Sequence, residues 1–193
     1  TSAIITCTLT TRLKDHAKMS AQAAFRTKIL FDTNQLLQRA KSEEEILSQT
    51  ASQLMKLLNR SLIVYPEQNG DLGSEQVFGI DGEVPCNIFS APEERDAANW
   101  TFANKKRSGA GTDSYPDAKG LYLALRTGGG VFGVIGIDLS EKPLDAFENS
   151  VLLSILGEGA LAIENRRNAL EKEQAALQAR NEELRANLLR TIS

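Results

Sequence analysis

The clearest pattern in the chain is an apolar residue at every seventh position near the C-terminal end. We assign these residues to position d of a heptad repeat: Leu156, Ile163, Leu170, Leu177 and Leu184. Position a is polar in the middle of the repeat, at Gln174 and Asn181, and apolar again at Leu188. Polar a positions fix the register of a parallel coiled coil at a cost in stability. The pattern therefore predicts a weak homodimer through this C-terminal helix, with a single solvated amphipathic helix as the alternative.

Two helices are predicted at the other end of the chain. Residues 18–41 contain strong helix formers without glycine or proline, which favours one continuous helix. Ser42 and Glu45 have the spacing of a capping box, and they open a second helix over residues 42–58. Its apolar positions recur on one face: Ile46, Leu47, Thr50, Ala51, Leu54, Leu57 and Leu58. We expect that face to pack on a β-sheet.

Short β-rich runs, separated by turn residues, follow this second helix. The candidate strands are residues 62–65, 75–80, 86–89, 121–127 and 131–139. Pro66 ends the first strand, and Asn69 with Gly70 marks a turn after it. The glycines at 128–130 join the last two strands into a hairpin. Runs of this kind predict an antiparallel sheet.

Two further helices complete the predicted domain. Ser90 and Glu93 form a second capping box that opens a helix over residues 92–107, and a closing helix begins near Asp145. An antiparallel sheet covered by helices is an α+β domain. We divide the chain into a signalling helix, a domain and a stalk, at residues 1–41, 42–164 and 165–193.

The closing helix contains two glycines, Gly157 and Gly159. Each costs about 1 kcal/mol relative to alanine in a helix interior. Either they let a neighbouring helix approach closely, or they form a compliant joint between the domain and the stalk. The sequence favours neither of these two roles.

The composition and the reactive side chains argue against catalysis. With 41% hydrophobic and 24% charged residues the chain is ordinary for a globular protein, and a net charge of -3 gives no field that favours nucleic acid. His16 is the single histidine, and Cys7 and Cys86 are far apart in the sequence. Neither a histidine-based catalytic pair nor a metal cluster can be built from them. We assign no catalytic residue, no metal site and no cofactor.

The N-terminal residues have the pattern of a membrane exit. Residues 3–9 are mostly apolar but far too few to span a bilayer, and basic residues predominate from Arg12 to Lys28. This order is typical of the cytoplasmic end of a membrane helix under the positive-inside rule. An N-terminal tail with scattered basic residues is the alternative.

Two stretches resemble a known family. Residues 182–193 resemble the approach to the phosphoacceptor helix of a sensor histidine kinase, and they stop just before the histidine of that family. The middle of the chain resembles the GAF domain of KdpD-type, potassium-responsive sensor histidine kinases: Ala97, Trp100 and Phe102, then Gly109 to Pro116, Leu121 to Leu125 and Val131 to Asp138. Ala124 departs from this family, which usually has proline there. The resemblance implies a GAF-like antiparallel sheet with long N- and C-terminal helices.

The resemblance also implies a role and a place in the cell. A GAF domain of this family lies at the cytoplasmic face of the membrane, next to the membrane helices at its N-terminus, and passes a signal to its own kinase core. Under this interpretation the chain is a non-catalytic signalling module in the regulation of potassium uptake. A small-ligand or cation receptor is the alternative, and so is a module that only dimerises. A GAF methionine sulfoxide reductase would need clustered cysteines, and a bilin receptor would need a suitably flanked cysteine, which Cys86 is not.

A candidate ligand pocket follows from the same resemblance. Trp100, Gly111, Thr112 and Asp113 would line the usual GAF pocket and offer a hydroxyl and a carboxylate to a ligand. The alternative is structural: Thr112 and Asp113 satisfy the backbone of a turn, and Trp100 belongs to the core.

Overall fold

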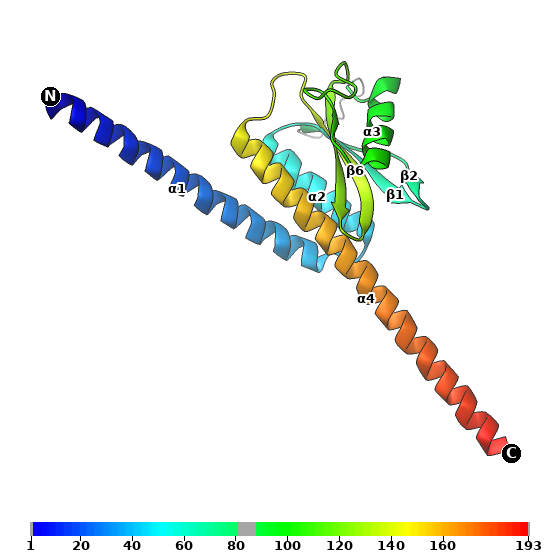
Figure 1. Ribbon diagram of the computed structural model, residues 1–193. Coiled ribbons are helices and arrows are strands. Elements are labelled where there is room, and N and C mark those ends of the chain that lie inside the picture. The colour runs from blue at the N-terminus through cyan, green and yellow to red at the C-terminus, as the bar shows by residue number, and fades with distance from the viewer. Residues whose placement is uncertain (1, 81–87, 193) are drawn as a thin grey trace.

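The computed structural model describes residues 2–80 and 88–192 and has the expected α+β architecture (Figure 1). Within these residues, four helices and six strands follow one another: α1 Ser2–Arg39, α2 Glu43–Leu58, β1 Leu62–Gln68, β2 Asp71–Leu72, β3 Gln76–Phe78, α3 Pro92–Asn104, β4 Ser108–Gly109, β5 Gly120–Thr127, β6 Gly130–Asp138 and α4 Ala146–Ile192. The candidate strand at 86–89 lies partly outside the described residues, and its last two residues, 88 and 89, are not in a strand.

The strands form one antiparallel sheet in the order β2, β1, β6, β5, β4, and β3 also pairs with β1. The predicted hairpin is the pair β5 and β6, in which Leu123 lies opposite Ile135. The prediction that Pro66 ends β1 is wrong. The strand continues to Gln68, because Pro66 pairs with Gly133 and its carbonyl oxygen accepts a hydrogen bond from the N–H of Gly73 at 2.8 Å.

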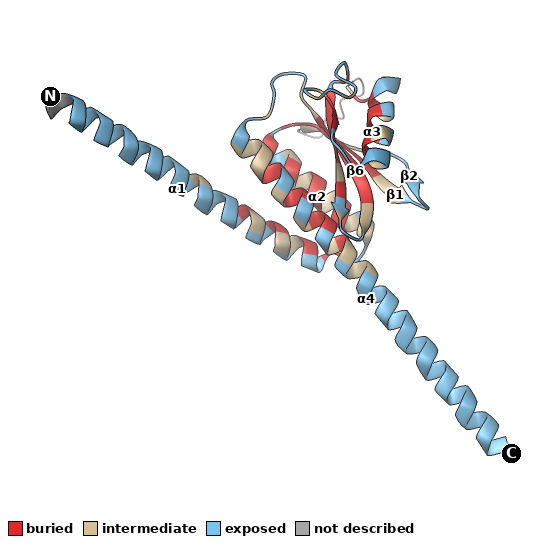
Figure 2. Cartoon of the chain, viewed as in Figure 1, coloured by how far each residue is buried: buried red, intermediate tan, exposed pale blue. Residues whose placement is uncertain are grey.

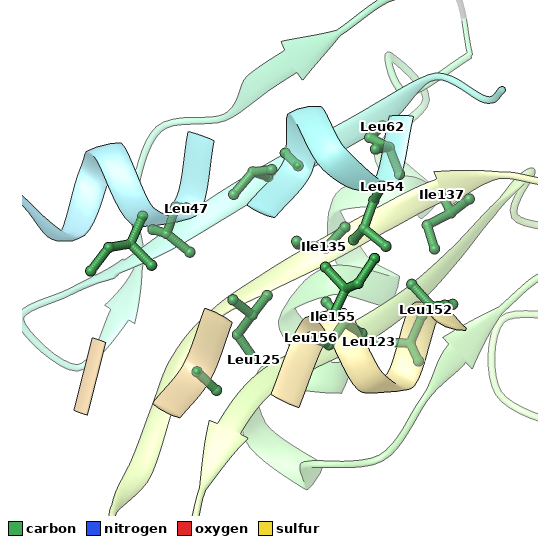
Figure 3. Close-up of a cluster of buried hydrophobic side chains, with 14 of the residues drawn as sticks. Leu47, Leu54, Leu62, Leu123, Leu125, Ile135, Ile137, Leu152, Ile155 and Leu156 are labelled. Atoms are coloured by element: carbon green, nitrogen blue, oxygen red, sulfur yellow. The ribbon is translucent and has the colours of Figure 1, made fainter. Parts of the chain in front are cut away.

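Helices cover both faces of this sheet. α2 and α4 pack on one face, with α1 lying against these two helices, and α3 lies alone on the other face (Figure 1). Figure 3 shows how the larger core is built, with Leu54 of α2 and Ile155 of α4 meeting Ile135 and Ile137 of β6. The apolar face predicted for the second helix accounts for this packing. At about 25 cal/mol per Å² of buried apolar surface, such a core is the main stabilising term of the fold.

Side chains cap the two helices that build the core. Ser42 Oγ accepts from the N–H of Glu45 at 3.1 Å, while Glu45 accepts from the N–H of Lys41 at 2.7 Å. At the start of α4, Asp145 and Glu148 each accept a hydrogen bond from the N–H of the other, at 2.7 and 2.9 Å. The predicted cap by Ser42 is therefore confirmed, while the carboxylate of Glu45 accepts from the residue before the cap, Lys41, rather than from Ser42 itself.

The prediction for α3 needs correction at both ends. Its N-cap is Ala91 rather than Ser90, and Pro92 supplies the preset backbone angle of a first helical residue. The helix ends at Asn104 instead of 107, because Lys105 takes a left-handed conformation (φ 57°) and donates its N–H to Thr101 at 2.8 Å.

The two long helices run side by side in the same direction. α1 begins at Ser2, well before the predicted start at residue 18, and its second half lies against the first half of α4. The N-terminal part of α1 leaves the domain on one side, and the C-terminal part of α4 leaves it on the opposite side, both exposed (Figure 2). Among the described residues one helix, α4, is long and apolar enough to cross a membrane. Its apolar first half, however, lies in the core of the domain.

Candidate functional site

The four residues that the sequence assigned to a ligand pocket lie around one open cavity. Trp100 comes from α3, and Gly111, Thr112 and Asp113 come from the loop after β4. The cavity has a volume of about 920 Å³ and lies at the β5 edge of the sheet. Because β4 pairs with β5 no further than Tyr122, the following residues of β5 form a wall of this space. We call it the edge cavity.

The edge cavity combines an apolar wall with a cluster of charges. Its apolar wall is made by Leu123 of β5 and by Leu153 and Leu156 of α4, beside Gly157. The charged residues of the lining are Lys105, Lys106, Arg107 and Arg126 against Asp113. Sequence reasoning missed the four cations, because they lie on two segments whose approach depends on the sheet pairing.

The loop after β4 satisfies its own backbone. Thr112 Oγ1 lies 2.8 Å from the carbonyl oxygens of both Gly109 and Ser114. Gly109 has a φ of 93°, and a side chain there would meet the backbone oxygen of Gly120. The turn interpretation therefore accounts for the hydroxyl of Thr112, whereas Asp113 is exposed at the rim. The loop is a shaped wall of the cavity.

The space between α3 and the sheet is filled by side chains, including a buried carboxylate. Glu94 of α3 is 2% exposed and accepts hydrogen bonds from the N–H groups of Lys119 and Gly120 and from the hydroxyl of Tyr122, at 2.7, 3.1 and 2.8 Å. Burial, followed by the hydrogen bond to Glu94, raises the pKa of Tyr122 above its ordinary value. Burial also raises the pKa of Tyr65 to about 12. These three donors hold α3 on β5 and satisfy the carboxylate.

Glu94 left no signal in the sequence. A glutamate in the first turn of a helix is normally solvated and stabilised by the helix dipole, so its burial could not be foreseen. Across residues 2–80 and 88–192, no group of His, Cys, Asp and Glu side chains is arranged to hold a metal ion.

A cluster of polar contacts marks the point where α4 leaves the domain. Arg167 donates to Glu43 of α2 at 2.8 to 3.0 Å and to Glu67 of β1 at 3.0 Å, and its guanidinium lies 5.0 Å from the ring centre of Phe132. The N–H of Gly70, with Arg167 as a further partner, holds the pKa of Glu67 below its ordinary value. We call this cluster the exit clamp. It fastens α4 to two other elements of the domain.

Comparison with known proteins identifies relatives of this chain in sequence and in structure. No family model matches the chain. It is 31% identical over 192 residues to the Sensor protein KdpD of Clostridium acetobutylicum, which covers 99% of this chain and 21% of that protein. It is 25% identical over 189 residues to the Sensor protein KdpD of Escherichia coli, covering 96% of this chain and 20% of that protein. The crystal structure of the native GAF domain of the potassium sensor histidine kinase KdpD from Escherichia coli superposes with a TM-score of 0.55 and 22% identity, over 78% of this chain and 99% of that one.

The chain has the GAF fold with flanking helices, and its sequence is homologous to a segment of the KdpD sensor proteins. Both the fold class and the relationship predicted from the sequence are confirmed. The chain spans about a fifth of the length of these relatives, at 21% and 20%.

The GAF domain itself takes up part of the predicted coiled-coil seam. Leu156 and Ile163 are 5% and 0% exposed in the core of the domain, so the prediction that they face a partner helix is wrong. The later positions of the seam are exposed: Leu170, Gln174, Leu177, Asn181, Leu184 and Leu188. A seven-residue repeat serves a core stripe and a coiled-coil seam equally well over two heptads. The free stalk therefore begins after Arg167.

The two glycines of α4 have different surroundings in the GAF domain. A Cβ on Gly159 would lie 2.6 Å from Oγ1 of Thr50 in α2, so this glycine permits the close approach of two helices. A Cβ on Gly157 would meet no atom within 4 Å, and this residue lines the edge cavity. Close packing therefore accounts for Gly159, and a role of the pair as a joint stays a prediction.

Proposed function

We propose that this chain is the cytoplasmic, signal-transmitting GAF module of a membrane sensor histidine kinase that regulates potassium uptake, and that it has no catalytic activity of its own. The homology to KdpD sensor proteins supports the proposal that the parent protein is a sensor kinase of this kind. The observation that carries the proposal is the pair of long helices, which pack along each other inside the domain and leave it on opposite sides (Figure 1).

The contact between α1 and α4 suits a relay that moves by small steps. Two hydrogen bonds join the helices, from Arg26 Nη2 to Ser154 Oγ at 2.7 Å and from Asn34 to Glu158 at 3.0 Å. The apolar part of the contact is formed by Ile29 and Leu37, which are buried in the core, and by Phe25, whose ring centre lies 6.3 Å from that of Phe147 in α4. A shift of α1 along α4 would exchange these two hydrogen bonds and change this apolar contact, and coupling between sites in proteins typically amounts to about 1 to 3 kcal/mol.

A homodimer through the stalk is the second part of the proposal. Leu170 follows Ile163 by seven residues, which places the two within about 20° on the helix surface. The seam of the stalk therefore continues the same face that carries the GAF domain. Two straight α4 helices paired through this seam would bring both domains into the space between them, so we infer that α4 bends or splays at the exit clamp around Arg167 when the stalk pairs.

The relay is tested in the full-length sensor protein, with autophosphorylation measured across potassium concentrations. Arg26→Ala combined with Asn34→Ala removes both hydrogen bonds to α4 and should change the response amplitude. Lys28→Ala combined with Gln35→Ala changes exposed residues of the same helix and serves as the matched control. An unchanged response of the first pair, in a protein that unfolds like the wild type, would rule out the α1–α4 contact as the relay.

A phosphorylation assay on the isolated chain tests whether it lacks catalytic activity. The one histidine of the sequence, His16, lies in α1, and the glycines at 128–130 form the β5–β6 turn rather than a phosphate-binding loop, so the isolated chain should take up no phosphate and hydrolyse no ATP. Incorporation of labelled phosphate by the isolated chain would contradict the non-catalytic assignment.

A further inference from the structure

We propose that the edge cavity binds a small organic anion with two or more negative charges, of the phosphorylated class. This goes beyond the relay, which needs no ligand. The carboxylate of Asp113 suggests a cation as the ligand when the sequence is read alone, whereas the lining of the cavity favours an anion. The argument rests on charge, on the open edge of the sheet and on the position of the cavity against α4.

The lining of the edge cavity is strongly positive in an otherwise acidic chain. Its lining holds four exposed cations and one exposed acid, whereas the whole chain carries 22 basic and 25 acidic residues. Lys105, Lys106 and Arg107 follow the C-terminal end of α3, and Arg126 comes from β5. A helix C-terminus attracts nearby cations, but it does not account for Arg126 on a separate strand. Among the described residues none of these four cations forms an ion pair with an acid.

The edge of the sheet adds backbone groups to this charge. β4 is two residues long and pairs with β5 only at Leu121 and Tyr122. From Leu123 to Arg126, β5 has β6 on one side and the cavity on the other. An unpaired strand edge presents N–H groups at alternate residues, and such groups bind the oxygen atoms of an anion.

The cavity reaches the helix that leaves the domain. Leu153, Leu156 and Gly157 of α4 form its apolar wall, and the space beside Gly157 is open within 4 Å. A bound molecule would therefore place its charge on the cations and its apolar part against α4. The volume of about 920 Å³ is within the range of small-molecule sites in proteins.

Binding can be measured with the purified chain, because Trp100 in the cavity lining is its only tryptophan. Tripolyphosphate and adenosine triphosphate are titrated separately at low salt, with tryptophan fluorescence and calorimetry as readouts. Arg107→Gln combined with Arg126→Gln should weaken the affinity about tenfold or more, since charged hydrogen bonds to phosphate are lost. Gly157→Leu should fill the open space and exclude the adenosine compound more than tripolyphosphate.

Arg12→Gln combined with Lys14→Gln removes two exposed cations from α1 and is the matched control. The proposal stands if either compound binds below millimolar concentration and the control pair changes the affinity less than about twofold, against tenfold for the cavity pair. It is overturned if neither compound binds at millimolar concentration, or if both pairs weaken binding equally, which indicates diffuse attraction. Failure here leaves the potassium response of the α1–α4 relay untouched, so the two proposals fail separately.

Discussion

Replacing each glycine of α4 with alanine distinguishes a packing residue from an open one. Alanine inside a helix is favoured over glycine by about 1 kcal/mol. At Gly157 nothing opposes this gain, because no atom lies within 4 Å of the added Cβ. Gly157→Ala should therefore raise the free energy of unfolding by about 1 kcal/mol.

At Gly159 the same methyl group meets α2. The added Cβ lies 2.6 Å from Oγ1 and 3.0 Å from Cγ2 of Thr50. Thr50 is buried, and its hydroxyl donates to the carbonyl oxygen of Ile46 at 2.7 Å, so a rotation of the side chain loses that hydrogen bond. Overpacking of a core typically costs about 1 to 3 kcal/mol, which cancels or exceeds the helix gain. Gly159→Ala should be neutral or destabilising by up to about 2 kcal/mol.

Urea unfolding of the purified chain measures both variants, with unchanged m values as the condition for comparing midpoints. Thr50→Ala removes both atoms that the new methyl group would meet, and in that background Gly159→Ala should gain stability as Gly157→Ala does. A coupling of about 1 to 3 kcal/mol between positions 50 and 159 is the expected result of this double-mutant cycle. Equal stabilisation by the two alanines in the wild-type background would refute the close approach of α2 and α4.

Two further predictions concern the exit clamp and the stalk. The depressed pKa of Glu67 means that the folded chain binds a proton at this carboxylate less tightly than the unfolded chain does. The contribution of Glu67 to the stability of the fold is therefore present above the ordinary pKa of 4.5 and is lost as the pH falls through the folded pKa. Glu67→Gln should reduce the fall of the melting temperature with pH in the acid range. An unchanged dependence of the melting temperature on pH would exclude this contribution of Glu67. Gln174→Ile combined with Asn181→Ile should tighten the proposed dimer, and an unchanged sedimentation profile would count against the stalk as the contact.

Features that depend on neighbours in the sequence were predictable. The hairpin of β5 and β6 follows from strand-forming residues on both sides of three glycines. The cap of α2 follows from Ser42 and Glu45, because its two hydrogen bonds span only four residues. The inward face of α2 follows from its spacing of apolar residues. In each case the pattern that predicts the element lies within the element itself or in the turn beside it.

Features that depend on contacts between residues far apart in the sequence could not be predicted from it. The heptad positions Leu156 and Ile163 fit a coiled coil, yet the sheet of the same domain covers them. A heptad differs from the straight helix by about 20° per repeat, so two repeats cannot separate a core stripe from a dimer seam. The four candidate pocket residues were placed together, whereas the cations beside them depend on how α3 and β5 meet.

The surroundings of α4 explain why the relay and the cavity would act on the same part of the helix. Successive residues point about 100° apart, so neighbours on one turn face different partners. Ser154 and Glu158 bond to α1, while Leu153 and Gly157, one residue before each, line the edge cavity. A shift of α1 and a molecule in the cavity would therefore push the same two turns from adjacent sides. Ile155 and Ile163 hold those turns on the sheet, and the movement left to α4 is along or about its own axis toward Arg167.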